Sequence, residues 1–193
     1  MPFTNRQIEI IEAATQLIGK NGVHSLTTKS LAKEMGFSEP ALYRHFKNKV
    51  DILNSVLQYF KSNIGDYILP ILSADTTGIE KMKNLIDFQF SHFKKNPAIV
   101  MVIFSETSFQ DNEMLSHTVL NIMTQKQTLI ESIIKFGQLD NSIRNDIKED
   151  QLATIIMGSM RIHILKWRLS NYSFDLVDEG QKLWNTIQLI IKK

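Results

Sequence analysis

The chain has 193 residues, 43% of them hydrophobic and 22% charged, which is an ordinary composition for a globular protein with a buried core. The net charge is only +2, so the composition as a whole shows no polybasic tail or global basic field. The absence of cysteine excludes disulfides and thiol chemistry and favours a reducing compartment. No signal-peptide pattern and no run of ~18 apolar residues is found, so we expect a cytoplasmic protein that does not enter a membrane.

Positive charge is concentrated in the first quarter of the chain. Residues 1–50 hold seven Lys or Arg residues against four Glu residues, whereas the remainder is slightly negative. A small basic module of this kind is suited to binding phosphates.

The first predicted helix lies between Thr4 and Asn21. Thr4 and Gln7 have the spacing of a capping box, and Ile11 and Ile18 belong to an apolar stripe at helical spacing. Gly22 follows as a helix stop. We expect this helix to brace the two shorter helices that follow.

A short second helix is predicted after Thr27 or Thr28, either of which can cap its start. Leu31 and Met35 recur at helical spacing on its apolar side. Gly36 comes directly after the last apolar residue, where a left-handed backbone conformation costs glycine least. The pattern therefore predicts a helix that ends in a tight turn.

The third helix is predicted to begin at Ser38 as its cap, with Pro40 in the first turn, where a missing N–H costs little. Leu42 and Phe46 are four residues apart and give this helix one buried stripe. Two short helices around a tight turn, the second with a single apolar side, are typical of a helix-turn-helix unit.

The outward positions of this unit provide candidate DNA contacts. We expect hydroxyls, ammonium groups and backbone at the helix start to hold phosphates, and a guanidinium and small side chains to read base edges. The predicted phosphate and positioning residues are Thr28, Lys29, Ser38, Tyr43, His45 and Lys49, and Pro40 in the first turn of the third helix is also expected at the DNA-binding surface. The predicted base-reading residues are Glu39, Ala41 and Arg44. An ordinary amphipathic helix with a solvated face would show the same residue types.

Long helices are predicted for the rest of the chain. Asn48 and Asp51 indicate the start of an amphipathic helix that we expect to end near Leu69, because Pro70 interrupts it. Small polar residues predict a linker over 73–78 and a polar turn over 137–145. Further helices are predicted over 79–95, 98–108, 111–136, 146–169 and 174–191. With no repeat and no alternating strand pattern, we expect an all-α protein.

The last two predicted helices are apolar on more than one side. A helix of this kind needs two partners, and one of them can be the same pair in a second copy, packed as a four-helix bundle. The predicted interface residues are Leu152, Ile155, Ile156, Ser159, His163, Leu183, Trp184, Ile187 and Ile191. A well-buried pair within one chain is the alternative.

No catalytic motif is found. The phosphate-loop, dinucleotide-turn, nucleophile-elbow and zinc-protease patterns are all missing, so we expect no enzyme, no metal and no cofactor. Glu113 and His117 have a spacing that could hold one metal, although a solvated helix face explains them better. His163 is expected to be an interface or core residue.

Residues 27–49 and their neighbours closely resemble the DNA-binding domain of the TetR (tetracycline repressor) family. The resemblance spans roughly Thr4 to Phe60 and is carried by residues 27–28, 31–32, 35–38, 41–46, 48–49 and 52–53, with the core Leu-Tyr-x-His-Phe-x-x-Lys at 42–49. It implies an all-helical homodimer, usually a repressor, whose C-terminal domain binds a small molecule. It also implies that the helix over 49–70 moves the DNA-reading units when ligand binds.

The resemblance implies two domains, an N-terminal three-helix DNA-binding domain over 1–50, continuing into the helix 49–70, and a helical effector-binding and dimerisation domain over 71–193. Bulky residues of the middle helices would line the pocket, and few charged residues are expected inside it, so we expect an apolar or amphipathic effector. The candidate pocket residues are Phe88, Phe93, Met101, Phe104, Met123 and Trp167. For each of them, plain core packing is the alternative.

We therefore expect a dimeric repressor that binds an inverted-repeat operator, with half-sites roughly 34 Å apart, and leaves it when a small ligand binds. One alternative is a DNA-bound protein of the same fold whose C-terminal domain binds a protein partner. The other is a helical enzyme or carrier with an incidental N-terminal helix pair.

Overall fold

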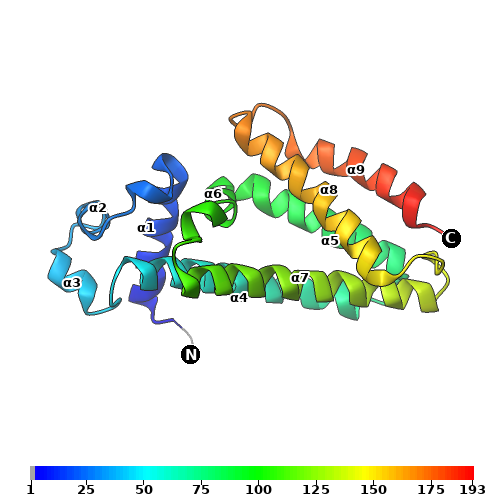
Figure 1. The fold of residues 1–193 in the computed structure, drawn as a ribbon, viewed down its shortest axis with the longest axis horizontal. Coiled ribbons are helices and arrows are strands. Elements are labelled where there is room, and N and C mark those ends of the chain that lie inside the picture. Colours follow the sequence, from blue (N-terminus) through cyan, green and yellow to red (C-terminus); the bar gives the residue numbers. More distant parts are fainter. Residues whose placement is uncertain (1–2) are drawn as a thin grey trace. The chain divides into compact units, whose positions relative to one another are not determined.

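The computed structural model describes residues 3–193, with the side chains of residues 63, 64, 66, 106 and 107 left out. The regular elements of the described residues are helices, apart from an isolated bridge between Ile143 and Lys192, which confirms the predicted all-α class (Figure 1). Their order is α1 (Asn5–Asn21), η1 (Val23–Ser25), α2 (Thr28–Glu34), α3 (Glu39–Tyr43), α4 (Lys49–Ser73), α5 (Gly78–Lys95), α6 (Pro97–Ile103), η2 (Glu106–Phe109), α7 (Glu113–Leu139), α8 (Glu149–Leu169) and α9 (Leu176–Ile191). Within the described part of the chain, no helix has the length and apolar character needed to cross a membrane.

The chain packs into two compact units. One comprises the described residues through Asn63 together with Pro97–Asn121, and the other comprises Ile64–Asn96 together with Ile122–Lys193. Packing thus assigns α4 and α7 partly to each unit. The functional division into 1–50 and 71–193, with the helix 49–70 continuing from the first domain, stays a prediction.

In the first unit, α1 forms the brace that the sequence predicts. The Thr4 hydroxyl accepts a hydrogen bond from Gln7 N and the Gln7 side chain accepts one from Thr4 N, which completes the capping box. The other end of α1 packs on α6 so closely that a Cβ at Gly19 would lie 2.5 Å from the Cβ of Ala98. Glycine at this position lets the two backbones approach.

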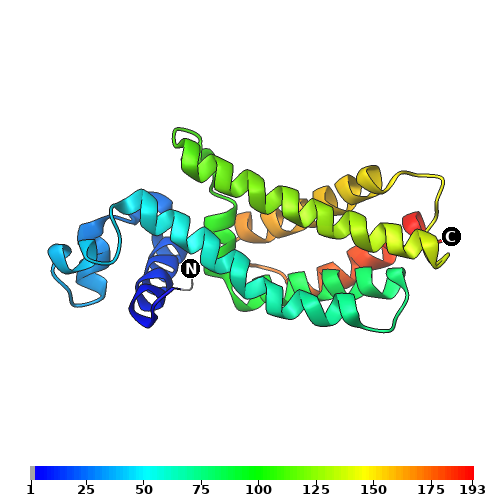
Figure 2. The same cartoon turned by 90° about the horizontal axis from the view of Figure 1, so that it is seen from below.

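The α4 helix begins with a reciprocal cap. Asn48 Oδ1 accepts a hydrogen bond from Asp51 N, and Asp51 Oδ2 accepts one from Lys47 N, both at 2.9 Å. The predicted end before Pro70 is wrong, because α4 runs through Pro70 to Ser73 as one helix (Figure 2). The proline lies in the last turn, and its carbonyl still accepts a hydrogen bond from Ala74 N at 3.1 Å.

In the second unit, α5, α8 and α9 pack against one another around a buried apolar core. Gly180 of α9 lies against Phe90 of α5, and an added Cβ at Gly180 would be 2.7 Å from the ring. The start of α5 is held by the turn after α7, since Gly78 N donates to Asp140 Oδ2 at 2.7 Å and Ile79 N donates to Ser142 Oγ at 3.1 Å.

Two predicted boundaries near the end of α7 are wrong. The turn was expected to begin at Gly137, but α7 continues to Leu139 because Gly137 is used for close packing rather than for a turn. Gly137 is buried, and a Cβ there would lie 2.5 Å from the Ile143 side chain. The next helix begins at Glu149 instead of Asp146, because Asp146 belongs to the connecting loop.

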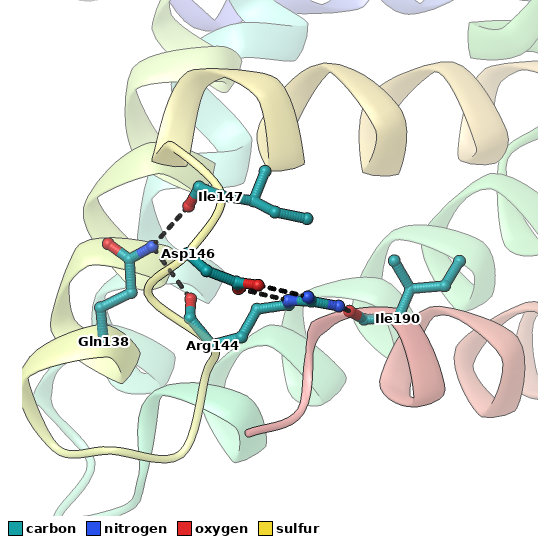
Figure 3. A network of polar contacts seen from close by, with 5 residues as sticks. All are labelled: Gln138, Arg144, Asp146, Ile147 and Ile190. Carbon is teal, nitrogen blue, oxygen red and sulfur yellow. Dashed lines mark hydrogen bonds and ion pairs between the residues drawn. The ribbon is translucent and has the colours of Figure 1, made fainter.

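A polar network holds that loop to the end of α9 (Figure 3). The Arg144 guanidinium donates two hydrogen bonds of 2.6 Å to the Asp146 carboxylate and one of 3.2 Å to the carbonyl of Ile190. Gln138 Nε2 donates to the carbonyls of Arg144 and Ile147 at 3.1 and 3.0 Å. The hydrogen bonds from Arg144 lower the pKa of Asp146 below its ordinary value.

Candidate nucleic-acid interface

The α2 helix and the turn after it have the capped geometry that the sequence predicts. Ser30 N donates to Thr27 Oγ1 and Thr27 N donates to Ser30 Oγ, both at 2.9 Å. After α2, Gly36 has φ +67°, and Phe37 N donates to Ala32 O at 2.8 Å. This pairing, together with the hydrogen bond of 3.2 Å from Gly36 N to Lys33 O, is a Schellman motif. It confirms the left-handed glycine and sets the angle at which the chain enters α3.

The α3 helix is short and buries one side. Leu42 is fully buried and Phe46, just beyond the helix, is 3% exposed. Pro40 lies in the first turn, as predicted. The prediction for Ser38 needs correcting in one respect. Ser38 occupies the N-cap position and its carbonyl accepts from Ala41 N at 3.0 Å, but its hydroxyl makes no capping hydrogen bond.

The predicted DNA contacts fall into an exposed set and a half-buried set. The exposed side chains are Lys29, Ser38, Pro40, Tyr43 and Arg44. The half-buried ones are Thr28, Glu39, Ala41, His45 and Lys49. The structure therefore leaves hydroxyl, phenol, ammonium and guanidinium groups accessible on and beside α2 and α3. Contact with DNA stays a prediction for each of these residues.

Hydrogen bonds join the outer sides of α2 and α3. Thr28 Oγ1 donates to Glu39 Oε2 at 2.8 Å, and the Tyr43 hydroxyl donates to Thr28 Oγ1 at the longer distance of 3.5 Å. Glu39 is thus oriented by Thr28, which limits how freely its carboxylate can turn toward a base. In this arrangement Tyr43 is half exposed, at 50%, with its phenol on the surface of the unit.

Two supporting residues were missed by the sequence analysis. Gln7 was assigned only a capping role, yet its Nε2 also donates to the carbonyl of His45 at 3.3 Å and so links α1 to the end of α3. The Arg6 guanidinium lies 4.2 Å from the centre of the Phe37 ring, in cation–π contact with the turn. Both contacts join residues more than thirty positions apart, and helical periodicity contains no signal for them.

The predicted pocket residues lie in different environments. Phe93, Phe104 and Trp167 are buried, Phe88 and Met101 are half-buried, and Met123 is 46% exposed. Met101 and Phe104 belong to the first compact unit and the other four residues to the second. A shared role in ligand binding stays a prediction.

Most of the predicted dimer residues have side chains that are buried within a single chain. Six are buried in the protomer core, namely Leu152, Ile156, Leu183, Trp184, Ile187 and Ile191. Ile155 is 46% exposed, and Ser159 and His163 are half-buried. The apolar side chains that these two helices do expose also include Ile162, Leu169, Leu189 and Ile190. The apolar periodicity of the sequence located α8 and α9, but it did not distinguish the side of each helix that faces the core of the chain from the side that is exposed.

Two histidines singled out in the sequence, His117 as a possible metal ligand and His163 as an interface or core residue, make hydrogen bonds within the chain. Glu113 and His117 are exposed, and His117 Nδ1 lies 3.3 Å from Asn121 Nδ2. His163 Nδ1 lies 2.8 Å from the Ser159 carbonyl, so this ring nitrogen donates the hydrogen bond. Among the described residues, no group of three or more His, Asp or Glu is placed to hold a metal ion.

Two family profiles match nearly the whole chain. Residues 10–56 match the family of bacterial regulatory proteins called the tetR family, and residues 60–192 match the C-terminal region of YsiA-like proteins. The first match contains α2, the turn and α3.

Full-length relatives and solved structures support the same fold. The nucleoid occlusion factor SlmA of Vibrio campbellii is 23% identical over 190 residues, which cover 98% of this chain and 97% of that protein. The fatty acid degradation regulator FadR from Bacillus halodurans superposes with a TM-score of 0.87 at 20% identity, over 97% of both chains. The regulator FadR from Bacillus subtilis, in complex with stearoyl-CoA, superposes with a TM-score of 0.80 at 23% identity, over 93% of this chain and 96% of that chain.

Proposed function

Because this chain belongs to the TetR family of bacterial regulatory proteins, we propose that it is a homodimeric repressor that leaves its operator when a small amphipathic ligand binds its C-terminal half. The membership itself establishes a DNA-binding regulator with a helix-turn-helix fold. The ligand, the dimer and the direction of regulation are the proposed parts.

The observation that carries the DNA-binding proposal is the division of α3 into a buried side and a polar side. Leu42 and Phe46 anchor it in the core, while Tyr43 and Arg44 remain exposed with Lys29 of α2. Tyr43 and Lys29 would bind phosphates and fix the register on the duplex, whereas Arg44 would contact base edges in the major groove.

Dimerisation would follow from the apolar side chains that α8 and α9 expose. Ile155, Ile162 and Leu169 recur every seven residues along α8, and Leu189 of α9 is 85% exposed. Covering this stripe with the same helices of a second copy would remove it from water. Two joined copies can address two half-sites, as an inverted repeat requires.

Release by a small ligand is supported by the fold shared with a regulator that was solved in complex with stearoyl-CoA. That ligand combines a long apolar chain with a charged end. An amphipathic effector would suit the mixture of buried aromatic and polar residues in the second compact unit.

A second candidate function is supported by the full-length similarity to nucleoid occlusion factors. In it, the C-terminal half binds a protein partner while α3 stays on DNA, and no small ligand causes release. A thermal-shift screen of amphipathic small molecules, followed by operator release with each hit, separates the two. Ligands that stabilise the protein and free the DNA support the repressor. A screen without such ligands supports the alternative.

The DNA-binding proposal is tested by footprinting the purified full-length protein on the DNA that flanks its gene and measuring affinity against salt. We expect an inverted-repeat footprint and an affinity that falls steeply with salt, since each neutralised phosphate contributes about −0.9 to the slope of log K against log salt.

Tyr43→Phe combined with Lys49→Ala should weaken binding to every sequence alike and reduce that slope by about one. Lys135→Ala, at an exposed position of α7, is the matched control and should change neither quantity. If the double variant keeps the affinity and slope of the unaltered protein, the docking of α3 described here is wrong.

A further inference from the structure

The second compact unit contains a polar cluster formed by three helices. Gln89 of α5 is 5% exposed, and its Oε1 accepts a hydrogen bond of 3.0 Å from Lys126 Nζ of α7. Arg161 of α8 is close enough for its positive charge to act on Lys126. The DNA-binding interface does not use any of these residues.

The cluster has an unused donor. Gln89 Nε2 is buried and has no hydrogen-bond partner among the described residues. Buried amide donors are nearly always paired, because an unpaired one loses its bond to water and gains nothing in return. A buried donor in this position therefore indicates a group that the chain itself does not supply.

The same place favours negative charge. Burial, and secondly the charge of Arg161, lowers the pKa of Lys126 to about 8. At neutral pH the lysine is still mostly protonated, and its ammonium group donates a hydrogen bond to the neutral amide of Gln89. Two cationic side chains near a free N–H form a site for an oxyanion and repel a cation.

Apolar residues surround the cluster at the next helical turn. Phe93 lies four positions after Gln89 on α5, Ile130 four after Lys126 on α7, and Ile164 three after Arg161 on α8, and all three are buried. Since such spacings place residues on the same side of a helix, and since α5 and α7 run in opposite directions, buried apolar side chains flank the polar cluster on both sides. A ligand that fits both would have an anionic head and an apolar body.

We propose that Gln89 Nε2 and Lys126 Nζ, assisted by the positive charge of Arg161, bind the anionic head group of an amphipathic ligand. The proposal rests on the proposed function, because this ligand would be the effector. The head group is a carboxylate or a phosphate ester, since both accept hydrogen bonds from N–H groups and both are attracted by the two cations.

The test measures ligand binding to the full-length protein without DNA by isothermal titration calorimetry. Decanoate provides a carboxylate head, stearoyl-CoA provides phosphates, decanol is a neutral probe with the chain of decanoate, and choline is a cationic probe. We expect at least one anionic probe to bind and choline not to bind. If decanoate is the anionic probe that binds, decanol should bind at least roughly tenfold more weakly than decanoate. Which anionic probe binds identifies the head group.

Lys126→Met keeps an unbranched apolar side chain close to the length of the lysine stem and removes the ammonium group. It should weaken binding of the anionic probe on the order of tenfold to a hundredfold and leave decanol unaffected. Lys135→Met, an exposed lysine on the same helix, is the matched control and should bind as the unaltered protein does. Binding of neither anion, preferential binding of choline, or unchanged anion binding by Lys126→Met would each overturn the proposal.

DNA binding of the same proteins is measured in parallel. Lys126→Met should retain operator affinity, which also shows that it folds. If the protein binds the anion through Lys126 but does not bind DNA, the proposed regulator fails and the anion site stands. If it binds DNA normally but no anion, the anion site fails and the regulator stands.

Discussion

Lys126→Met should change how the stability of the protein depends on pH. In the folded chain the pKa of Lys126 is about 8, against an ordinary value of 10.5, because burial disfavours the charged ammonium. The folded state therefore loses this proton at a lower pH than the unfolded state. Between about pH 8 and 10.5 the unfolded state binds more protons, so the free energy of unfolding must rise with pH in this range.

The size of this rise follows from the two pKa values. A difference from 10.5 to about 8 corresponds to at most roughly 3 kcal/mol, since one pH unit is worth about 1.4 kcal/mol and solvent partly screens the half-buried side chain. Below pH 8 the unaltered protein carries the whole cost of the buried charge. Lys126→Met has no such group, so the variant gains nothing from this source as pH increases.

Urea unfolding followed by far-UV circular dichroism, at equal protein concentration and at pH values from 7 to 10, measures the effect. The free energy of unfolding of the unaltered protein should rise relative to that of Lys126→Met by up to roughly 3 kcal/mol over this range. Lys135→Met is the control and should follow the unaltered protein. Parallel profiles for the unaltered protein and Lys126→Met would refute the argument that burial disfavours the charge.

Three further substitutions test the packing and the polar network. Gly180→Ala should destabilise the fold by about 1–3 kcal/mol in urea, because the new Cβ would lie 2.7 Å from the Phe90 ring. Gly36→Ala should cost about 1 kcal/mol in the same assay, because φ there is +67°. Arg144→Ala should speed amide exchange in the last turn of α9, because it removes the bonds to Asp146 and to the end of that helix, with little change in the unfolding midpoint.

Each of these has a control within the chain. A Cβ added at Gly158 of α8 would meet no neighbouring side chain within 4 Å, so Gly158→Ala should be neutral or stabilise the helix by up to about 1 kcal/mol. If Gly180→Ala or Gly36→Ala behaves like Gly158→Ala, the strain assigned to that glycine is absent. Arg144→Lys keeps the charge but lacks the forked donors, and should restore only part of the slow exchange. Unchanged exchange in Arg144→Ala would show that the network does not hold the chain end.

Local signals in the sequence predicted the DNA-reading unit well. The cap at Thr27, the left-handed Gly36 and the buried Leu42 each depend on residues within one or two helical turns. Such interactions follow from backbone geometry and from the amphipathic period alone. The same signals were enough to indicate the family that the profile matches establish.

Predictions that depend on contacts distant in sequence were weaker. Pro70 was expected to end a helix and Gly137 to open a turn, but the first is tolerated in a last turn and the second admits a close neighbour. The hydrogen bond between Gln89 of α5 and Lys126 of α7 joins residues that are 37 positions apart. Neither residue stands out in the apolar pattern of its own helix. Periodicity shows which residues share a side of a helix, but not which side meets which neighbour.

Each compact unit is built from two separate segments of the chain, and this affects how hybrid regulators can be constructed. The chain passes from one unit to the other after Asn63, Asn96 and Asn121, so the first compact unit, which contains α2 and α3, is not one continuous segment of the sequence. A graft that stops near residue 63 would leave out α6 and expose the place where Gly19 meets Ala98. A chimera that transfers the first compact unit to another regulator would therefore need to carry residues 97–121 as well.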